Sequence, residues 1–280
     1  MQGNLYLVST PIGNLEDITF RAISTLKGVD VIFAESIERT KKLLSHYDID
    51  KKVFSYNKDN ESVKAKSIIN YLKKNHNVAL VTDAGTPSIS DPGFFVQSNI
   101  SKSTNVIPIP GASSLSCALS VSRIPINSFI FLGFLPKKSS DRKNKLISLY
   151  PNQLPIVLFE SKHRVIDLLN DVKEIYDNVT IGIFRELTKI HETIIHGNID
   201  EIIDFFGNNA PKGEFVIIIG PGKNIKSTSH YHKAITTLIS KKLSNKDIVE
   251  LIKLFSTDSK KEIYKKVLSI RQEMGIGHMD

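Results

Sequence analysis

Residues 78–92 constrain the fold of this chain more than any other stretch. The stretch opens with four apolar residues, Val78 to Val81, which are typical of a strand buried in a parallel sheet. Residues 83–87 then combine glycine with proline, which favours a tight turn, and Ser90-Asp91-Pro92 is typical of the start of a helix. Ligands of open α/β sheets bind in loops of this kind, at the carboxyl ends of strands. The stretch therefore predicts a ligand-binding loop, and an ordinary strand-to-helix turn is its alternative.

Strand-like apolar runs alternate with helical patterns through the first 120 residues. Besides the strand at 78–81, strands are expected at residues 5–8, 29–34, 53–56 and 106–111. Helices are expected at residues 39–46, 61–74 and 113–122, and a helix carrying Ala22 and Leu26 is expected to be capped by Asn14 or Asp17. This alternation predicts a mainly parallel α/β sheet.

The pattern changes after about residue 120. Further strands are expected at residues 129–134, 156–159, 179–184, 193–196 and 215–220, with helices at residues 164–173 and 200–206 and a basic loop at residues 136–143. Because this half is richer in strands, we expect a second α/β domain with a mixed sheet. The predicted division is residues 1–118, 119–222 and 228–280, with linker segments at 221–224 and 227–230.

The end of the chain is basic and helical. The net charge is +8, and from Lys223 onward the chain has twelve Lys or Arg and six Asp or Glu, a net charge of +6. Ser244 and Ser259 each precede an acidic residue by three positions and then an apolar run, a pattern typical of capping boxes. Two such helices resemble a helix-turn-helix, whose second helix carries Lys260, Lys261, Lys265, Lys266 and Arg271. Nucleic acid is the expected partner, ahead of a membrane, while a solvated helical face and a lysine-rich genome are the alternatives.

Several classes of protein are excluded by what the sequence lacks. One cysteine, Cys117, permits no internal disulfide, and no signal peptide or membrane-spanning run is present, so a reducing cytoplasm is expected. The chain has no G-x-x-x-x-G-K-S/T, no G-x-G-x-x-G after the first strand, no G-x-S-x-G and no His/Cys cluster with metal spacing. Polar loops at strand ends remain, and they predict an α/β enzyme with a loop-built ligand site and no metal.

Seven blocks of sequence carry a more specific signal. In chain order they are residues 7–19, 83–87 with 89–93, 108–112, 133–136, 160–161 with 163–164, 185–189 and 213–215. Together they resemble the ribosomal RNA small subunit methyltransferase I family, which is part of the tetrapyrrole methylase superfamily. The resemblance runs over residues 4 to about 220, and the tail is similar to the C-terminal helical module of that family.

The resemblance implies a fold and an activity. The implied fold has two α/β domains of the tetrapyrrole methylase type, with S-adenosylmethionine bound in the cleft between them, in a homodimer. The implied activity is methylation of a cytidine ribose 2′-hydroxyl in the decoding region of 16S ribosomal RNA, free or within the small ribosomal subunit.

Candidate site residues follow from this activity. For the methyl donor we expect Pro11, Asp83, Ala84, Gly85, Ile89, Ser113, Ser114, Pro211 and Lys212. For the reaction we expect Glu35, Arg185, Glu186 and Lys189, with Glu186 or Glu35 accepting the hydroxyl proton and Lys189 lowering the hydroxyl pKa or binding a phosphate. For RNA phosphates we expect Arg39, Lys137, Lys138, Arg142, Lys143, Lys260, Lys261 and Lys265. A structural ion pair at residues 185–189 and a solvated loop at residues 137–143 are the alternatives.

One block departs from the family pattern. Where the family usually reads A-E-D-T-R, this chain reads Ala34-Glu35-Ser36-Ile37-Glu38-Arg39, so the arginine is displaced by one position. Two other functions stay open on the sequence alone. One is a methylase of a tetrapyrrole or of a protein side chain, and the other is a non-catalytic RNA-binding assembly protein.

Overall fold

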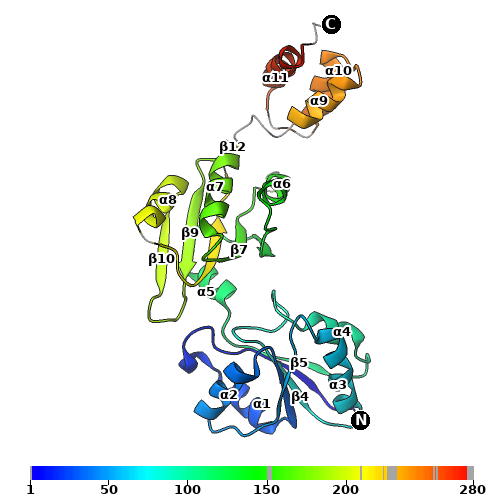
Figure 1. Ribbon diagram of the computed structural model, residues 1–280, viewed down its shortest axis with the longest axis vertical. Coiled ribbons are helices and arrows are strands. Elements are labelled where there is room, and N and C mark those ends of the chain that lie inside the picture. Colours follow the sequence, from blue (N-terminus) through cyan, green and yellow to red (C-terminus); the bar gives the residue numbers. More distant parts are fainter. Residues whose placement is uncertain are drawn as a thin grey trace.

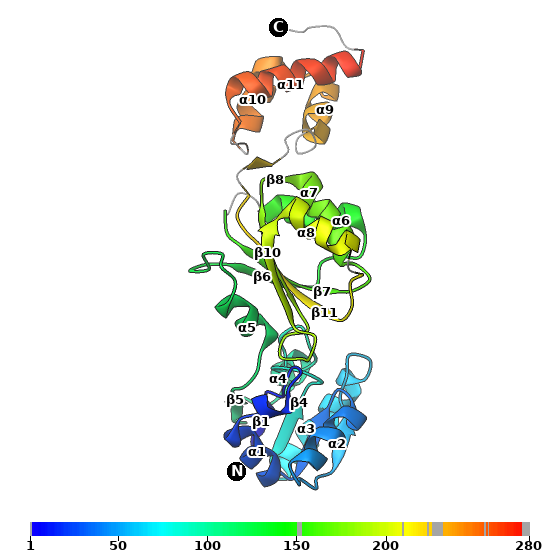
Figure 2. The same ribbon diagram turned by 90° about the vertical axis from the view of Figure 1, so that its left-hand side faces the viewer.

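The computed structural model describes residues 2–149, 153–208, 210–222, 224–225, 232–254, 256 and 258–275. Figures 1 and 2 show an elongated molecule in which two β-sheets and a C-terminal group of helices follow one another along the long axis. The N-terminal sheet and the C-terminal helices lie at opposite ends. In the part of the chain that is described, no helix is both long and apolar enough to cross a membrane.

The first sheet has five strands, and all of its strand pairs are parallel, as predicted. The strands are β1 (Leu5–Val8), β2 (Val31–Ala34), β3 (Val53–Ser55), β4 (Val78–Val81) and β5 (Val106–Ile109), in the order β3-β2-β4-β1-β5. Every residue of β2 and β4 is buried. Burial on both sides explains why these two strands are apolar throughout.

Helices cover both faces of the first sheet. On one face, α1 (Phe20–Gly28) and α2 (Ile37–His46) pack against a cluster that includes Ile32 and Ala34 of β2. On the other face, α3 (Glu61–Lys73) and α4 (Phe94–Asn99) pack against a cluster that includes Val31 and Phe33 of the same strand. The two-residue period of a strand therefore divides one apolar run between two cores.

The second sheet is mixed, as expected. Its strands are β6 (Ile130–Gly133), β7 (Ile156–Ser161), β9 (Thr180–Arg185), β10 (Thr193–Asn198) and β11 (Glu214–Ile219), in the order β10-β9-β11-β7-β6. The β6–β7 pair is parallel and the other three pairs are antiparallel. Beside it, β8 (Tyr176–Asp177) and β12 (Asn224–Ile225) form a two-stranded sheet.

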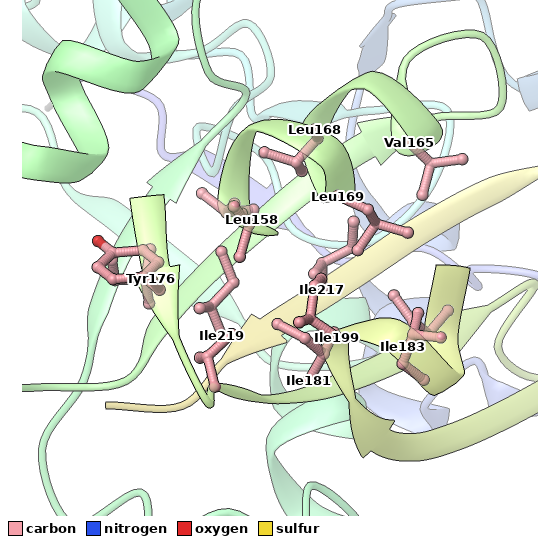
Figure 3. Close-up of a cluster of buried hydrophobic side chains, with 14 of the residues drawn as sticks. Leu158, Val165, Leu168, Leu169, Tyr176, Ile181, Ile183, Ile199, Ile217 and Ile219 are labelled. Atoms are coloured by element: carbon pink, nitrogen blue, oxygen red, sulfur yellow. The ribbon is translucent and has the colours of Figure 1, made fainter. Parts of the chain in front are cut away.

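The two faces of the second sheet have different neighbours. Three helices, α6 (Ser139–Leu149), α7 (Val165–Ile175) and α8 (Ile199–Asn208), contribute to the large apolar cluster on one face, part of which is shown in Figure 3. On the other face, α5 (Ser114–Ser120) contributes Ala118 to a cluster with Phe184 and Val216. Ile12, from the loop after β1, belongs to this second cluster. The strand-end loops of the first sheet therefore pack on the second sheet.

The C-terminal helices have a core of their own. They are α9 (His232–Ser240), α10 (Asn245–Lys253) and α11 (Lys260–Glu273). The core includes Ile235 of α9, Ile248 of α10 and Ile263 of α11, all of which are buried. Ser259 and Glu262 form the predicted capping box. At Ser244 the side chain caps the amide of Asp247, but the Asp247 carboxylate bonds the Ser244 hydroxyl instead of its amide, so this box is incomplete.

Several local expectations needed correction. Thr19, not Asn14 or Asp17, caps α1, and Asn14 instead caps a short 3-10 helix at Leu15–Asp17. The segment expected as a basic loop is largely helix, because α6 begins at Ser139. Helix α9 was not expected, and the second linker segment, residues 227–230, lies outside the described residues. The division into residues 1–118, 119–222 and 228–280 stays a prediction.

Candidate active site

A cavity of about 600 Å³ lies where the strand-end loops of the two sheets meet. Ligand sites for small molecules are commonly of this size. From the first half of the chain it is lined by Ile12, Glu35, Arg39, Asp83, Ala84, Gly85, Thr86, Ile89, Ser90, Asp91, Ser113 and Ser114. From the second half it is lined by Phe134, Phe159, Glu160, Ser161, Lys162, His163, Phe184, Glu186, Leu187, Lys189, Gly213, Glu214, Phe215 and Val216.

The loop after β4 is fixed to the loop after β1. The amide of Thr10 donates to the carbonyl of Gly85 at 2.9 Å, and the amide of Gly85 donates to the carbonyl of Thr10 at 3.0 Å. The hydroxyls of Ser9 and Thr86 lie 2.9 Å apart. Ser88 and Ser90 both have positive φ angles, of 71° and 67°, which are uncommon for residues with a side chain. The loop predicted to bind a ligand is thus held in one unusual conformation.

Three carboxylates gather on this wall of the cavity. The amide of Asp83 donates to Glu35 Oε2 at 3.4 Å, and Oδ1 of Asp83 is buried with no hydrogen-bond partner among the described residues. Burial, followed by the charge of Glu35, raises the pKa of Asp91 to about 6. Negative charge concentrated in this way favours a cationic ligand.

Arg39 reaches the same loop from α2. Its guanidinium lies 3.3 Å from Oδ2 of Asp83, and its side chain is 68% exposed. Ser36, which stands where the family usually has Asp, caps α2 by accepting from the amide of Arg39. Ser and Asp are both favourable caps, so the departure preserves the start of the helix. The displaced arginine contacts the ligand loop and lines the cavity.

The part of the cavity wall that comes from the second half of the chain carries a bonded group of three charged residues. Lys189 Nζ lies 2.9 Å from Glu186 Oε1 and 3.0 Å from Glu214 Oε2, and the amide of Glu214 also donates to Glu186 Oε1. Burial acts to lower the pKa of Lys189, but these two carboxylates outweigh burial and raise it. Burial acts to raise the pKa of Glu186, but Lys189 and the Glu214 amide outweigh it and lower the pKa. Lys189 is therefore a stable cation, and Glu186 is a weak base.

Most of the residues expected at the site do line this cavity. They are Glu35, Arg39, Asp83, Ala84, Gly85, Ile89, Ser113, Ser114, Glu186 and Lys189. Pro11, Arg185, Pro211 and Lys212 do not line it, although Pro11 and Arg185 directly adjoin Ile12 and Glu186, which do. Arg185 Nε is buried and has no hydrogen-bond partner among the described residues. The chemical roles assigned to all of these residues stay predictions.

Sequence reasoning did not select sixteen residues of the cavity wall, among them Asp91, Phe134, Lys162 and His163. Asp91, Phe134 and His163 lie inside blocks that were used only to identify the family, and Lys162 lies between the two parts of one such block. Their signal was their position at the end of a strand or in the loop that follows it. A single sequence could not show that these strand ends converge.

Two arginines expected to contact RNA or to face solvent are buried. Arg142 is 3% exposed, and its Nε donates to Asp171 Oδ2 at 2.6 Å, so it forms a buried ion pair between α6 and α7. Arg271 is 1% exposed and donates from Nε to Asn245 Oδ1 at 2.6 Å. Both guanidiniums are structural, because a buried charge must keep its partners.

The lysines predicted to bind RNA phosphates differ in whether they are exposed and in whether they already pair with a carboxylate. Lys137, Lys138, Lys261 and Lys265 are exposed. Lys143 is bonded to Glu174, and Lys260 is paired with Glu250. The exposed lysines remain the better candidates for phosphate contacts. Among the residues that the structure describes, no group of His, Cys, Asp or Glu has the arrangement of a metal site.

Comparison with known proteins identifies the family to which this chain belongs. Residues 4–203 match the family described as tetrapyrrole (corrin/porphyrin) methylases. The chain is 44% identical over 227 residues to ribosomal RNA small subunit methyltransferase I of Halalkalibacterium halodurans, covering 80% of this chain and 78% of that one. It is 41% identical over 268 residues to the protein of the same name from Rickettsia prowazekii, covering 94% and 96%.

Solved structures share the fold at low sequence identity. Diphthine synthase matches with a TM-score of 0.63 at 14% identity, over 80% of this chain and 91% of that chain. Cobalt precorrin-4 methyltransferase matches with a TM-score of 0.57 at 15% identity, over 78% and 94%. At these identities the likeness concerns the fold alone.

Proposed function

The chain belongs to the tetrapyrrole methylase family and, within it, to the ribosomal RNA small subunit methyltransferase I family, and from this membership we propose that it methylates the ribose 2′-hydroxyl of a cytidine in 16S ribosomal RNA. Methylation of small-subunit ribosomal RNA with S-adenosylmethionine follows from the family. The cytidine and the 2′-oxygen are the finer part of the proposal. The observation that carries it is the cavity, which combines a wall of three carboxylates with a wall that holds Lys162 and Lys189.

The acidic wall fits the methyl donor. S-adenosylmethionine supplies an activated methyl group on a sulfonium and also carries an amine, both of which are positive. Glu35, Asp83 and Asp91 line the wall together, and Asp83 Oδ1 is buried without a hydrogen-bond partner in the described part of the chain. Ile12, Phe184 and Val216 supply apolar surface to the same cavity, which suits an adenine ring. We propose that Asp83 and these apolar residues bind the donor.

Transfer of the methyl group requires little of the protein beyond positioning the two substrates and removing the proton of the ribose hydroxyl. The ribose oxygen attacks the methyl carbon, the carbon–sulfur bond breaks, and the hydroxyl proton passes to a base. A base is most effective when its pKa lies near the working pH, and the pKa of Asp91 is about 6. We propose Asp91, with Glu35 beside it, as the proton acceptor in place of Glu186, whose pKa is lowered. Lys189 stays positively charged and would hold the hydroxyl or a neighbouring phosphate.

RNA binding is proposed for the exposed cations around and beyond the cavity. Lys162 and His163 line the cavity and are exposed. Lys137 and Lys138 lie immediately before α6, and Lys261 and Lys265 lie on α11. Lysine side chains supply affinity for phosphate that does not depend on sequence. We also propose a homodimer in the cytoplasm, as the family resemblance implies.

Methyl transfer to defined RNA tests the function. Small ribosomal subunits from cells that lack this enzyme are incubated with the purified protein and labelled S-adenosylmethionine, and the labelled nucleoside is identified by mass spectrometry after digestion. We expect 2′-O-methylcytidine at one position. Asp83→Ala serves as the inactive control, because it removes the donor-wall carboxylate whose Oδ1 is buried without a hydrogen-bond partner among the described residues. A methyl group on a base, or no transfer to RNA, would refute the proposal.

A further inference from the structure

An exposed aromatic ring stands in the cavity beside its cationic residues. Phe134 lines the cavity and is 54% exposed, although an aromatic side chain is normally buried. Its ring lies 5.9 Å from the ring of Phe159 at an interplanar angle of 61°. Phe159 in turn packs against Phe131 of β6 at 5.1 Å. The ring is therefore supported from the second sheet and leaves much of its surface free.

The segment that carries Phe134 is held rigidly. Arg164 donates from its guanidinium to the carbonyls of Leu135 and Pro136, at 2.7 and 3.0 Å. The buried Arg142 donates to the carbonyl of Lys137 at 3.1 Å. On the other side, Gly133 has a φ of +60°, and a Cβ there would lie 2.6 Å from Oγ of Ser90 in the ligand loop. A surface fixed in this way binds at a low cost in conformational entropy.

The surroundings of the ring suit a nucleotide. Lys162 and His163 follow β7, which carries Phe159, and both line the cavity with exposed side chains. Proteins that read single-stranded RNA commonly stack unpaired bases on aromatic rings and bind the backbone with basic side chains. An enzyme that modifies a nucleotide inside RNA also has to hold that nucleotide out of its stack.

We propose that Phe134 is the stacking surface for the base of the target nucleotide. The inference rests on the proposed function, since it requires an RNA substrate, and it assigns the place where that substrate is recognised. Stacking on Phe134 would set the ribose at the cavity between the acidic wall and Lys189. The competing occupant is the adenine ring of the methyl donor, which has the same flat aromatic chemistry.

Fluorescence distinguishes the two occupants, because the chain contains no tryptophan. Phe134→Trp introduces a single reporter at the proposed surface, and Phe20→Trp places a matched reporter at an exposed position, 92% accessible, on α1. The probes are S-adenosylmethionine, a short oligoribonucleotide that contains the target cytidine, and the same oligoribonucleotide with an abasic site there. We expect the first oligoribonucleotide to quench Phe134→Trp, the abasic one to quench it much less, and Phe20→Trp to respond to none of the three probes.

Kinetics provide a second and independent readout. Loss of base–aromatic stacking lowers the affinity for the nucleic acid roughly ten- to hundredfold. We expect Phe134→Leu to lower kcat/KM for the RNA by about this factor while the affinity for S-adenosylmethionine, measured by calorimetry, stays the same. Phe134→Tyr keeps the ring and is expected to keep the activity.

Four outcomes overturn the inference. Quenching of Phe134→Trp by S-adenosylmethionine but not by RNA, or loss of donor affinity in Phe134→Leu, would assign the ring to the adenine. Normal RNA kinetics in Phe134→Leu would remove the ring from recognition while leaving the proposed function intact. A wild-type protein that transfers no methyl group to small ribosomal subunits would overturn the inference and the proposed function together.

Discussion

The guanidinium of Arg39 lies 3.3 Å from the carboxylate of Asp83, so α2 and the loop after β4 carry opposite charges into one cavity. The two residues are far apart in the sequence and meet because β2 and β4 are neighbours in a parallel sheet, whose carboxyl ends lie at the same edge. The pair also accounts for the departure from the family pattern. An arginine displaced by one position still reaches the ligand loop, while Ser36 caps its helix.

Substituting Asp83 with Ala is expected to weaken the binding of S-adenosylmethionine. Asp83 Oδ1 is buried without a hydrogen-bond partner among the described residues, and bonds to charged groups contribute about 1.5–3 kcal/mol, roughly ten- to a hundredfold in affinity. Calorimetric titration measures the change. Asp59→Ala, at an exposed turn, is the matched control and should bind normally. Equal affinity of Asp83→Ala and wild type would remove Asp83 from the donor site.

Substituting Arg39 with Ala is expected to affect RNA binding more than stability. An exposed ion pair contributes about 0–1 kcal/mol, so the free energy of unfolding should change by no more than that. If Arg39 contacts a phosphate, the slope of log affinity against log salt concentration should fall by about one. Urea denaturation and RNA titrations at several salt concentrations provide the two measurements. An unchanged salt slope would mean that Arg39 contacts no RNA phosphate and only pairs with Asp83.

The titration of Asp91 is expected to make both the free energy of unfolding and the rate of methyl transfer depend on pH. Its pKa of about 6 in the folded protein exceeds the usual value of about 3.9, so the folded protein holds this proton more tightly than the unfolded chain. The free energy of unfolding therefore loses this contribution as the pH rises from about 4 to about 6. Asp91→Asn should match wild type near pH 4 and be more stable than wild type above pH 6, as thermal unfolding at each pH will show.

The same residue makes a separate prediction for catalysis. If Asp91 accepts the proton, kcat/KM of wild type rises with pH through a midpoint near 6, and Asp91→Asn lowers the rate by about a hundredfold or more. Asp91→Glu keeps a carboxylate and should recover part of the rate. A purely structural role would leave the midpoint in place in Asp91→Asn, and that result would contradict the assignment.

Substituting Gly213 with Ala is expected to disrupt the bonded group of Lys189, Glu186 and Glu214. Gly213 has a φ of +84°, and an added Cβ would lie 2.4 Å from Oε1 of Glu186, which binds Lys189. We expect a loss of about 1–3 kcal/mol in stability, together with reduced methyl transfer. Gly207→Ala, in α8, is the control, since nothing lies near its Cβ. That change should stabilise the protein by about 0.5–1 kcal/mol, because alanine favours a helix over glycine.

The basic face of α11 is expected to bind RNA without affecting the donor. Lys261 and Lys265 are both exposed there. Replacing both with Ala should lower RNA affinity and reduce the salt slope by about two, while S-adenosylmethionine binds as before. Replacing Lys66 and Lys73, both exposed on α3, with Ala removes the same amount of charge as a control. RNA affinity that falls equally in the control would mean that only net charge matters.

The sequence by itself determined the local elements and their class. Runs such as Val78–Val81 indicated buried parallel strands because a strand covered on both faces must be apolar throughout. Ser259 and Glu262 indicated the start of α11 because the capping bonds join residues only three positions apart. The prediction failed at Ser139, where a polar, charged stretch proved to be the first turn of α6, a pattern that a loop would share.

Only the tertiary structure decided which charges act on a ligand and which hold the fold. Arg142 and Arg39 look alike in the sequence, yet one is buried against Asp171 and the other lines the cavity. Likewise, the sequence placed Lys189 and Glu214 on separate loops, and antiparallel pairing of β9 with β11 brought them together. The difference is physical. Strands and caps depend on neighbours within a few positions, whereas the burial and pairing of a charge depend on distant segments of the chain that meet only after folding.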